Sequence, residues 1–136
     1  MGKLHLEVVT PEKVMVSQEV DIVVAPGTMG EFGVLEGHVP FLSGIEPGEL
    51  RFTSGSQTER FLVTTGFSEV SNNKVSVLVD AAEKASEIDL ERARTAMERA
   101  KERLAKDRGE EDIDFLRAEA ALKRAIVRIR ISEKIN

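Results

Sequence analysis

The two parts of this chain are built from different residues. All four prolines lie in the first 47 residues, and nine of the ten glycines lie in the first 66. Beyond residue 84 there is one glycine and no proline, and alanine, arginine and glutamate are abundant. Glycine and proline mark turns, whereas the residues of the second part favour helices. We therefore predict a strand-rich module over residues 1–84 and a helical module over residues 85–136, with the boundary near residues 81–87.

The charge follows the same division. The net charge of −5 is the sum of −6 on residues 1–84 (6 basic, 12 acidic) and +1 on residues 85–136 (13 basic, 12 acidic). The acidic excess argues against nucleic acid as a partner. No apolar run approaches the ~20 residues of a membrane-spanning helix, and an acid at Glu7 comes too early for a signal peptide. The lack of cysteine excludes disulfides and thiolate metal sites and agrees with a cytoplasmic location.

Short strands are expected throughout the first module. Leu4, Leu6 and Val8 alternate with polar residues, the period of two that is typical of a half-buried strand. Further segments rich in β-branched and aromatic residues lie at 20–24, 50–53, 60–64 and 74–79. Turn signals lie at 25–27, 46–48, 53–56 and 71–73. Many short strands without a helical period between them predict an antiparallel β-sandwich or barrel.

The second module is predicted to be an antiparallel helical hairpin. Two series of apolar residues step by three and four, as on one face of a helix. They are Leu90, Ala93, Met97, Ala100 and Leu104, then Phe115, Ala118, Leu122, Ala125 and Ile129. Residues 107–109 interrupt the pattern, and Asp112 or Asp114 can cap the second helix. The stripes are narrow and rich in alanine, so we expect close but weak packing. Residues 127–131 alternate with a period of two, a pattern that a strand also shows.

No catalytic constellation is visible in the sequence. It contains no G-x-x-x-x-G-K-[ST] loop, no G-x-G-x-x-G motif and no His-Glu-x-x-His pair. His5 falls in a strand pattern and His38 in a loop, so a structural hydrogen-bonding role is favoured over a metal-ligand or base role for both. Glutamate and arginine four residues apart on a helix usually form a solvated surface. We therefore expect a non-catalytic chain with no bound metal and no required cofactor.

Basic side chains of the second module share helix faces. Spacings of seven and of four residues place them on one face of each helix. They are Arg92 and Arg99, then Arg124 and Arg128. A hairpin that turns at Gly109 brings Arg92 level with about residue 126, and converging guanidiniums can clamp a polyphosphate. Asp89 and Glu83, near the start of the first helix, could contact a ribose, an amine or a backbone amide. The alternative, which spacing alone favours, is a helix-start acid and arginines that pair with neighbouring glutamates.

The stretch 27–42 combines glycines with large apolar residues. Glycines at 27, 30, 33 and 37 make it loop-like. Its apolar residues are many for a loop: Met29, Phe32, Leu35 and Phe41. A turn that folds under the sandwich and a surface that docks a partner explain this pattern equally well.

The same stretch resembles the signature of a known family. Gly30-Glu31-Phe32-Gly33-Val34-Leu35-Glu36-Gly37-His38-Val39-Pro40-Phe41-Leu42 is similar to G-E-[FL]-G-[VI]-L-x-x-H-x-P-[LF]-L of the epsilon subunit of bacterial F-type ATP synthase. Residues 4–12 resemble the first strand of that family, and residues 65–70 resemble its G-[GF]-x-E-V hairpin. The order of the modules agrees across essentially the whole chain.

The resemblance implies a non-catalytic subunit of the central rotor stalk. In that family the sandwich docks on the gamma subunit and rests on the c-ring. It thereby couples proton transport to ATP synthesis by the alpha and beta subunits. By position in the signature, Glu31 belongs to the loop that faces the c-ring and His38 lies near the gamma-facing surface. The hairpin lies folded down or extends into the head and inhibits ATP hydrolysis. Such a subunit is peripheral, at the cytoplasmic face of the bacterial inner membrane.

The resemblance also implies a regulatory ligand. Some members bind ATP in the folded hairpin through an I-D-x-x-R-A motif and further arginines. Residues 88–93, Ile-Asp-Leu-Glu-Arg-Ala, match every specified position. The ATP-binding candidates are then Glu83, Ile88, Asp89, Arg92, Ala93, Arg99, Arg124 and Arg128.

Two other classes of function stay open. A free-standing ATP-sensing protein would use the same arginines without a gamma partner. A secreted adhesion or carbohydrate-binding module would usually use tryptophan and tyrosine, and this chain has neither. Co-purification with gamma, and through it with alpha and beta, separates these hypotheses.

Overall fold

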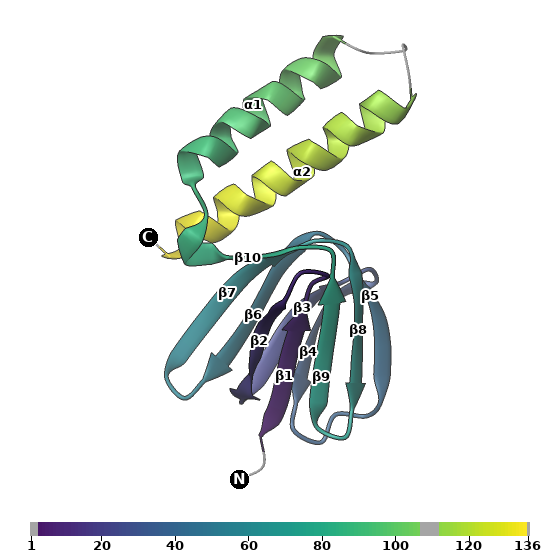
Figure 1. Cartoon of the computed structure of the whole chain (residues 1–136), viewed down its shortest axis with the longest axis vertical. Coiled ribbons are helices and arrows are strands. Elements are labelled where there is room, and N and C mark those ends of the chain that lie inside the picture. The colour runs from purple at the N-terminus through teal and green to yellow at the C-terminus, as the bar shows by residue number, and fades with distance from the viewer. Residues whose placement is uncertain (1–2, 107–111, 136) are drawn as a thin grey trace. The chain divides into compact units, whose positions relative to one another are not determined.

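The structure is a computed structural model that describes residues 3–106 and 112–135. The chain divides into two compact units, Met1–Lys84 and Ala85–Asn136. Figure 1 shows that the first consists of strands and the second of helices.

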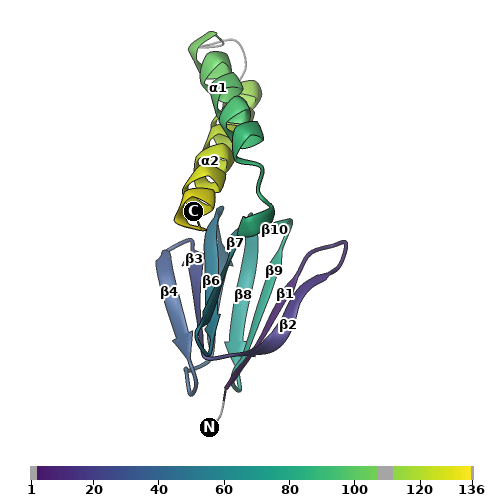
Figure 2. The same ribbon diagram turned by 90° about the vertical axis from the view of Figure 1, so that its left-hand side faces the viewer.

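Ten strands make up the first unit. They are β1 (Leu4–Val9), β2 (Val14–Val20), β3 (Ile22–Gly27), β4 (Gly30–Leu35), β5 (Phe41–Ile45), β6 (Gly48–Ser54), β7 (Gln57–Val63), β8 (Gly66–Ser71), β9 (Lys74–Val79) and β10 (Ala82–Lys84). Their order is β10-β7-β6-β3-β5-β8-β9-β1-β2, and β4, which lies off this path, pairs with β3. The sheet curls into a nearly closed sandwich (Figure 2). The predicted antiparallel sandwich is confirmed, with one exception, because β1 and β9 run parallel.

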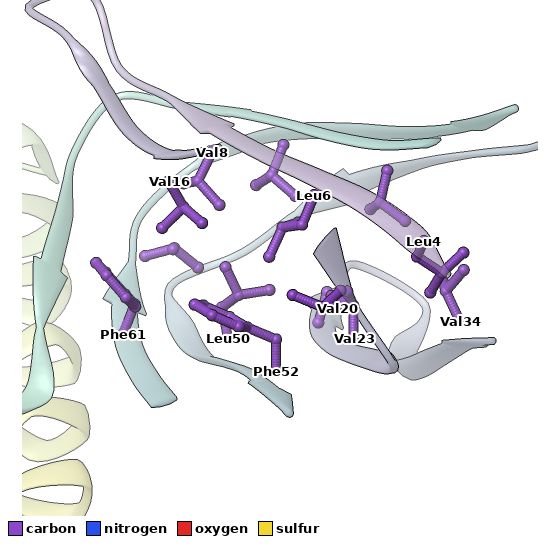
Figure 3. Close-up of a cluster of buried hydrophobic side chains, with 14 of the residues drawn as sticks. Leu4, Leu6, Val8, Val16, Val20, Val23, Val34, Leu50, Phe52 and Phe61 are labelled. Carbon is purple, nitrogen blue, oxygen red and sulfur yellow. The ribbon is translucent and has the colours of Figure 1, made fainter. Parts of the chain in front are cut away.

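The core of the sandwich is one continuous apolar cluster. Leu4, Leu6 and Val8 are fully buried, as the alternation of β1 predicts. They share the cluster with Leu50 and Phe52 of β6 (Figure 3). Each strand from β1 to β9 contributes at least one side chain to it. Ala82 of β10 packs against the same cluster. The core therefore joins both ends of the strand order and holds the sheet in its curled form.

The stretch 27–42 is not the loop that its glycines suggest. β4 pairs antiparallel with β3, and β5 begins at Phe41. Gly30, with φ of 118°, does form a turn, but Gly33 lies inside the strand. Glycine weakens a strand pattern, so only the pairing with β3 reveals β4. Glu31 accordingly lies in a strand, and not in the loop that its position in the family signature implies.

The turn predicted at residues 25–27 is also wrong. These residues, which include Pro26, are the end of β3. Proline cannot donate to a neighbouring strand, so it fits only where no N–H is needed. Pairing between β3 and β6 stops at Val24, before the proline. The Pro26 carbonyl accepts the N–H of Glu46 at 3.0 Å. The predicted strand 20–24 is also divided, since Asp21 separates β2 from β3.

One buried hydroxyl of the core has no partner among the described residues. Ser68 of β8 is 0% exposed and its Oγ forms no hydrogen bond there. An unpaired buried polar group costs about 1–3 kcal/mol. We expect Ser68→Ala to raise the free energy of unfolding by about 1 kcal/mol, measured by calorimetry. Ser43→Ala is the control. It should not raise the free energy of unfolding, because the Ser43 hydroxyl donates to the Gly44 carbonyl at 2.9 Å. Destabilisation by Ser68→Ala would show that its hydroxyl is paired.

The carboxylate of Asp21 forms a hydrogen bond with the turn between β6 and β7, and its protonation makes the stability of the sandwich depend on pH. Its Oδ2 accepts the N–H of Gly55 at 2.8 Å, and Lys3 Nζ lies 3.5 Å from Oδ1. This backbone hydrogen bond, with a smaller effect of Lys3, holds the pKa of Asp21 below its ordinary 3.8. A carboxyl whose pKa is lower in the folded state stabilises the fold above its unfolded pKa and loses this effect as the pH falls through the folded pKa.

We expect Asp21→Asn to lower the melting temperature near neutral pH, where only the wild-type side chain is charged. The difference should shrink below about pH 4, as the native carboxyl takes up a proton. Thermal denaturation of both proteins between about pH 7 and pH 2 checks this. A difference that stays constant over that range would contradict the ionised hydrogen bond.

The second unit is a helical hairpin, as predicted. A short 3-10 helix, η1 (Ala85–Glu87), precedes α1 (Leu90–Lys106) and α2 (Asp112–Ile135). Figure 1 shows α1 and α2 side by side and antiparallel, and they are in contact. The side chains of their seam are small and buried: Ala93, Ala100, Ala118 and Ala125. The predicted turn at 107–109 and the side chains of Asp112, Asp114 and Phe115 lie outside the described residues.

The last turns of the chain are helical. Residues 127–131, whose alternation also suits a strand, belong to α2. Ile131 is 1% exposed, so the apolar residues here still find burial within a helix.

Candidate functional site

The first turn of α1 is organised by Asp89. Its Oδ1 accepts the N–H of Arg92 at 3.0 Å, and its carbonyl accepts the N–H of Ala93 at 3.0 Å. This is the geometry of a helix N-cap, in which a side-chain oxygen satisfies an otherwise unpaired N–H. The structure therefore gives Asp89 the helix-start role that the sequence offered as one alternative.

Two further positions of the motif at 88–93 are explained by packing. Ile88 and Ala93 are buried, and the Ile88 N–H donates to the Ala85 carbonyl at 3.2 Å. Asp89 and Arg92 are the exposed positions among those that the motif specifies. Since Asp89 is the cap, the Arg92 side chain is the one without a part in the helix start or the seam.

The other candidate arginines also lie on the hairpin. Arg99 is exposed on α1, about 10 Å along the axis from Arg92. Arg124 and Arg128 are half-buried on α2, one turn apart. Each helix thus carries a pair of guanidiniums on one face. Glu83 differs from this set, because it lies half-buried in β10, within the first unit.

Glu31 is engaged with its own sheet. Its two carboxylate oxygens accept hydrogen bonds from the two terminal nitrogens of Arg51, at 3.1 Å each. Glu49 lies 3.5 Å from the same guanidinium and 2.6 Å from that of Arg60. The hydrogen bonds to Glu31 raise the pKa of Arg51 above its ordinary value. Nothing in the sequence indicated Arg51, which is 20 residues away from Glu31.

His38 lies in the β4–β5 loop, residues 36–40 between those strands, and is half-buried. Its Nδ1 donates to the Val39 carbonyl at 2.7 Å, so this nitrogen carries the proton. The ring meets Phe41 edge-on, with centroids 5.8 Å apart. His38 therefore shapes the loop by hydrogen bonding and packing.

An apolar row crosses the outer face of the sandwich. Val14, Val9, Leu78 and Phe67 lie on the adjacent strands β2, β1, β9 and β8, each directly opposite the next. Directly opposite residues share one face of a sheet. Leu42 of β5 lies on the same face, since it pairs with Glu69, two residues from Phe67 along β8.

The apolar row is exposed in the free chain. Phe67 is 48% exposed, Val14 58% and Leu42 68%. Because the opposite face of these strands is the core, the sheet is apolar on both faces here. A contiguous exposed apolar surface marks an interaction site. The sequence contained a signal for it that the period-two pattern obscured, namely the unbroken apolar runs Val8-Val9 and Val77-Leu78-Val79.

The described residues contain no group of histidine, aspartate and glutamate that could hold a metal ion. None of the described helices is long and apolar enough to cross a membrane.

Comparison with known proteins places both units in one family. Residues 3–85 match "ATP synthase, Delta/Epsilon chain, beta-sandwich domain", and residues 86–133 match "ATP synthase, Delta/Epsilon chain, long alpha-helix domain". The ATP synthase epsilon chain of Nitratidesulfovibrio vulgaris (strain DP4) is 51% identical over 128 residues, 94% of each chain. The ATP synthase epsilon chain of Syntrophobacter fumaroxidans is 51% identical over 134 residues, 97% of each chain.

A solved structure has the same fold. A chain in the cryo-EM structure of Euglena gracilis mitochondrial ATP synthase, OSCP/F1/c-ring in rotational state 1, superposes with a TM-score of 0.83 at 22% identity. The match covers 100% of this chain and 83% of that one. Family matches over both units and relatives at 51% identity agree with the signature at residues 30–42. The chain therefore belongs to the ATP synthase delta/epsilon chain family, among the epsilon subunits of the bacterial F-type complex.

Proposed function

We propose that the sandwich docks on the gamma subunit of the ATP synthase through the apolar row, with the β4–β5 loop beside it. The observation that carries this proposal is the exposure of Leu42, Phe67 and Val14 on one face of a sheet whose other face is the core. Removing such a surface from water contributes roughly 25 cal/mol per Å² of apolar area, which offsets the freedom lost on association. The subunit contributes no catalytic group and transmits rotation as a rigid part of the central stalk.

The tip of the β3–β4 hairpin is the proposed contact with the c-ring. Met29 at the tip is 96% exposed. Glu31 lies beside it, and its bidentate pair with Arg51 fixes the carboxylate before any partner arrives. The chain would then be peripheral at the cytoplasmic face of the inner membrane, held there by gamma and the c-ring, and would couple proton transport to ATP synthesis by alpha and beta.

The hairpin is the proposed regulatory part, which inhibits ATP hydrolysis when it extends into the head. Its seam is made of alanines, and helices in proteins are stabilised mostly by the packing of an apolar face, so the small contacts of this seam can be exchanged for other contacts. A chain truncated after Glu87 tests the division of labour. It should bind gamma like the full chain and no longer inhibit ATP hydrolysis by the complex. Loss of gamma binding would place docking residues in the hairpin, and retained inhibition would place the inhibitor in the sandwich.

ATP bound to the folded hairpin is the proposed control of that transition. A ligand that binds only one state, at 100 times its dissociation constant, stabilises it by about 2.7 kcal/mol. This shifts a ratio of about one to ten to about ten to one. Arg92, Arg99, Arg124 and Arg128 would bind the phosphates, and Arg92 is the first choice because its side chain has no part in the helix start.

Thermal denaturation with and without millimolar ATP tests the regulatory proposal. We expect ATP to raise the melting temperature of the hairpin, and expect no rise in an Arg92→Ala, Arg124→Ala double variant. Arg117→Ala is the matched control, because Arg117 is an exposed arginine of α2 outside the candidate set, and it should keep the rise. An equal rise in the double variant, or none in the wild type, would contradict ATP binding by these arginines. The rival free-standing sensor predicts the same rise but no complex with gamma.

A further inference from the structure

The two-residue turn between β8 and β9 contains an unusual choice of residue. Asn72 and Asn73 have φ of 49° and 60°, and Ser71 pairs with Lys74 on either side. These are the left-handed angles of a type I′ turn. Glycine is preferred at the second central position of this turn, where a side chain is strained. Asn73 therefore calls for an explanation beyond the turn itself.

The Asn73 side chain reaches a different part of the sandwich. Its Oδ1 accepts the N–H of Gly37 in the β4–β5 loop at 2.7 Å, across 36 residues of sequence. Glycine at position 73 would satisfy the turn but would lack this acceptor. The backbone carbonyl of Asn73 also accepts the N–H of His5 at 2.9 Å, a contact that does not depend on the side chain.

The anchored residue, Gly37, is the second residue of the β4–β5 loop. The His38 N–H donates to the Leu35 carbonyl at 3.1 Å, and Gly37 has φ of 83°. This is a type II turn with glycine at its third position. The turn is held internally by one hydrogen bond, and Asn73 ties it to the rest of the sandwich. The loop then leads through Val39, which is 68% exposed, to Leu42 at the end of the apolar row.

We propose that Asn73 is a positioning residue that holds the β4–β5 loop in the conformation in which it docks on gamma. This inference rests on the docking surface proposed above. A loop that is already ordered loses less conformational freedom on association. Removing the anchor should therefore weaken docking without weakening the sandwich, because glycine also relieves the strain of the turn.

Three variants and the complex of alpha, beta and gamma subunits test this role. Asn73→Gly should lower the affinity about three- to tenfold, the effect of one lost hydrogen bond, while its melting temperature stays at or above that of the wild type. Exchange of the Gly37 amide hydrogen should become faster. Asn73→Asp keeps an acceptor oxygen and should bind nearly as the wild type does. Asn72→Gly relaxes the same turn without touching the loop and should change neither affinity nor Gly37 exchange.

The outcomes separate this inference from the docking proposal. Leu42→Ala and Phe67→Ala should each weaken the complex if the apolar row docks on gamma. If they do and Asn73→Gly binds as the wild type does, the role of Asn73 is wrong and the docking surface stands. If neither weakens it, the docking surface is wrong and the inference falls with it. A third outcome is that Asn73→Gly binds more weakly and also melts at a lower temperature, while Asn72→Gly binds equally weakly. This outcome would assign Asn73 to the turn alone.

Discussion

Replacing Gly66 by alanine should strongly destabilise the β-sandwich. A Cβ at this position would overlap the carbonyl oxygen of Leu78 and lie 2.7 Å from the Cα of Val79. Both are backbone atoms of β9, and Gly66 is paired with Val79 on that side and with Ile45 of β5 on the other. β8 therefore cannot move away from one neighbour without breaking its ladder with the next. Since neither side can yield, we expect a loss of roughly 3 kcal/mol or more.

Gly33→Ala is the matched control for this substitution. Gly33 also lies in a strand, but a Cβ there would meet nothing closer than 3.9 Å. Alanine in a compatible conformation is neutral or slightly stabilising, because it restricts the unfolded chain. Calorimetry should show the sandwich transition of Gly66→Ala lowered by at least about 10 °C and that of Gly33→Ala unchanged. The chain has no tryptophan or tyrosine, so backbone circular dichroism is the second probe. Equal melting of the two variants would contradict the close approach of β8 and β9.

The two glycines also show what a sequence can and cannot predict. Gly66 and Gly33 look alike as residues in a strand, and only the neighbouring strand distinguishes a required glycine from a tolerated one. For the same reason β4 was predicted to be a loop. A glycine-rich strand is recognised by its partner β3, and a pairing partner is a property of the fold rather than of the local pattern.

Periodic features were predicted well because they are local. The alternation of β1 and the stripes on α1 and α2 identify buried residues without knowledge of the fold. The parallel pairing of β1 with β9 was not predicted, since the two strands are far apart in the chain and nothing in either specifies the direction of the other. The end of α2 shows the opposite conflict, because its local alternation suits a strand and yet it is helical.

The candidate site also combines features that the sequence predicts with features that only the folded chain shows. The spacing of the hairpin arginines could be read directly, and so could an acid at the start of α1. The contacts of Asp89 could not be predicted in the same way. Spacing alone favours a cap and the family motif favours a ligand, and the N–H of Arg92, 3.0 Å from Oδ1, shows the cap. The contacts of Glu31 with Arg51 and of Asn73 with Gly37 join residues 20 and 36 positions apart. No spacing rule covers such distances, so these partners appear only in the folded chain.

Replacing Ala125 by leucine should separate the two helices of the hairpin while the sandwich stays folded. Ala125 is 0% exposed, and the described side chains that α1 buries in the seam are also alanines. Leucine is nearly as good a helix former as alanine, so any loss must come from packing. Overfilling a close-packed contact costs about 1–3 kcal/mol. Helices in proteins are stabilised mostly by tertiary packing, and this cost is a large part of what the seam of small side chains supplies, so we expect a marked loss of helical circular dichroism.

Ala120→Leu provides the control, because Ala120 is exposed on the same helix and receives the same side chain. It should leave the helical signal unchanged, and both variants should keep the sandwich transition in calorimetry. If the hairpin is the regulatory part, Ala125→Leu should also bind ATP more weakly and inhibit ATP hydrolysis more strongly, because opening the seam favours the extended state. Equal helicity of the two variants would mean that the seam tolerates a large side chain. The close approach of the helices through alanine, on which the weak hold of the hairpin depends, would then be wrong.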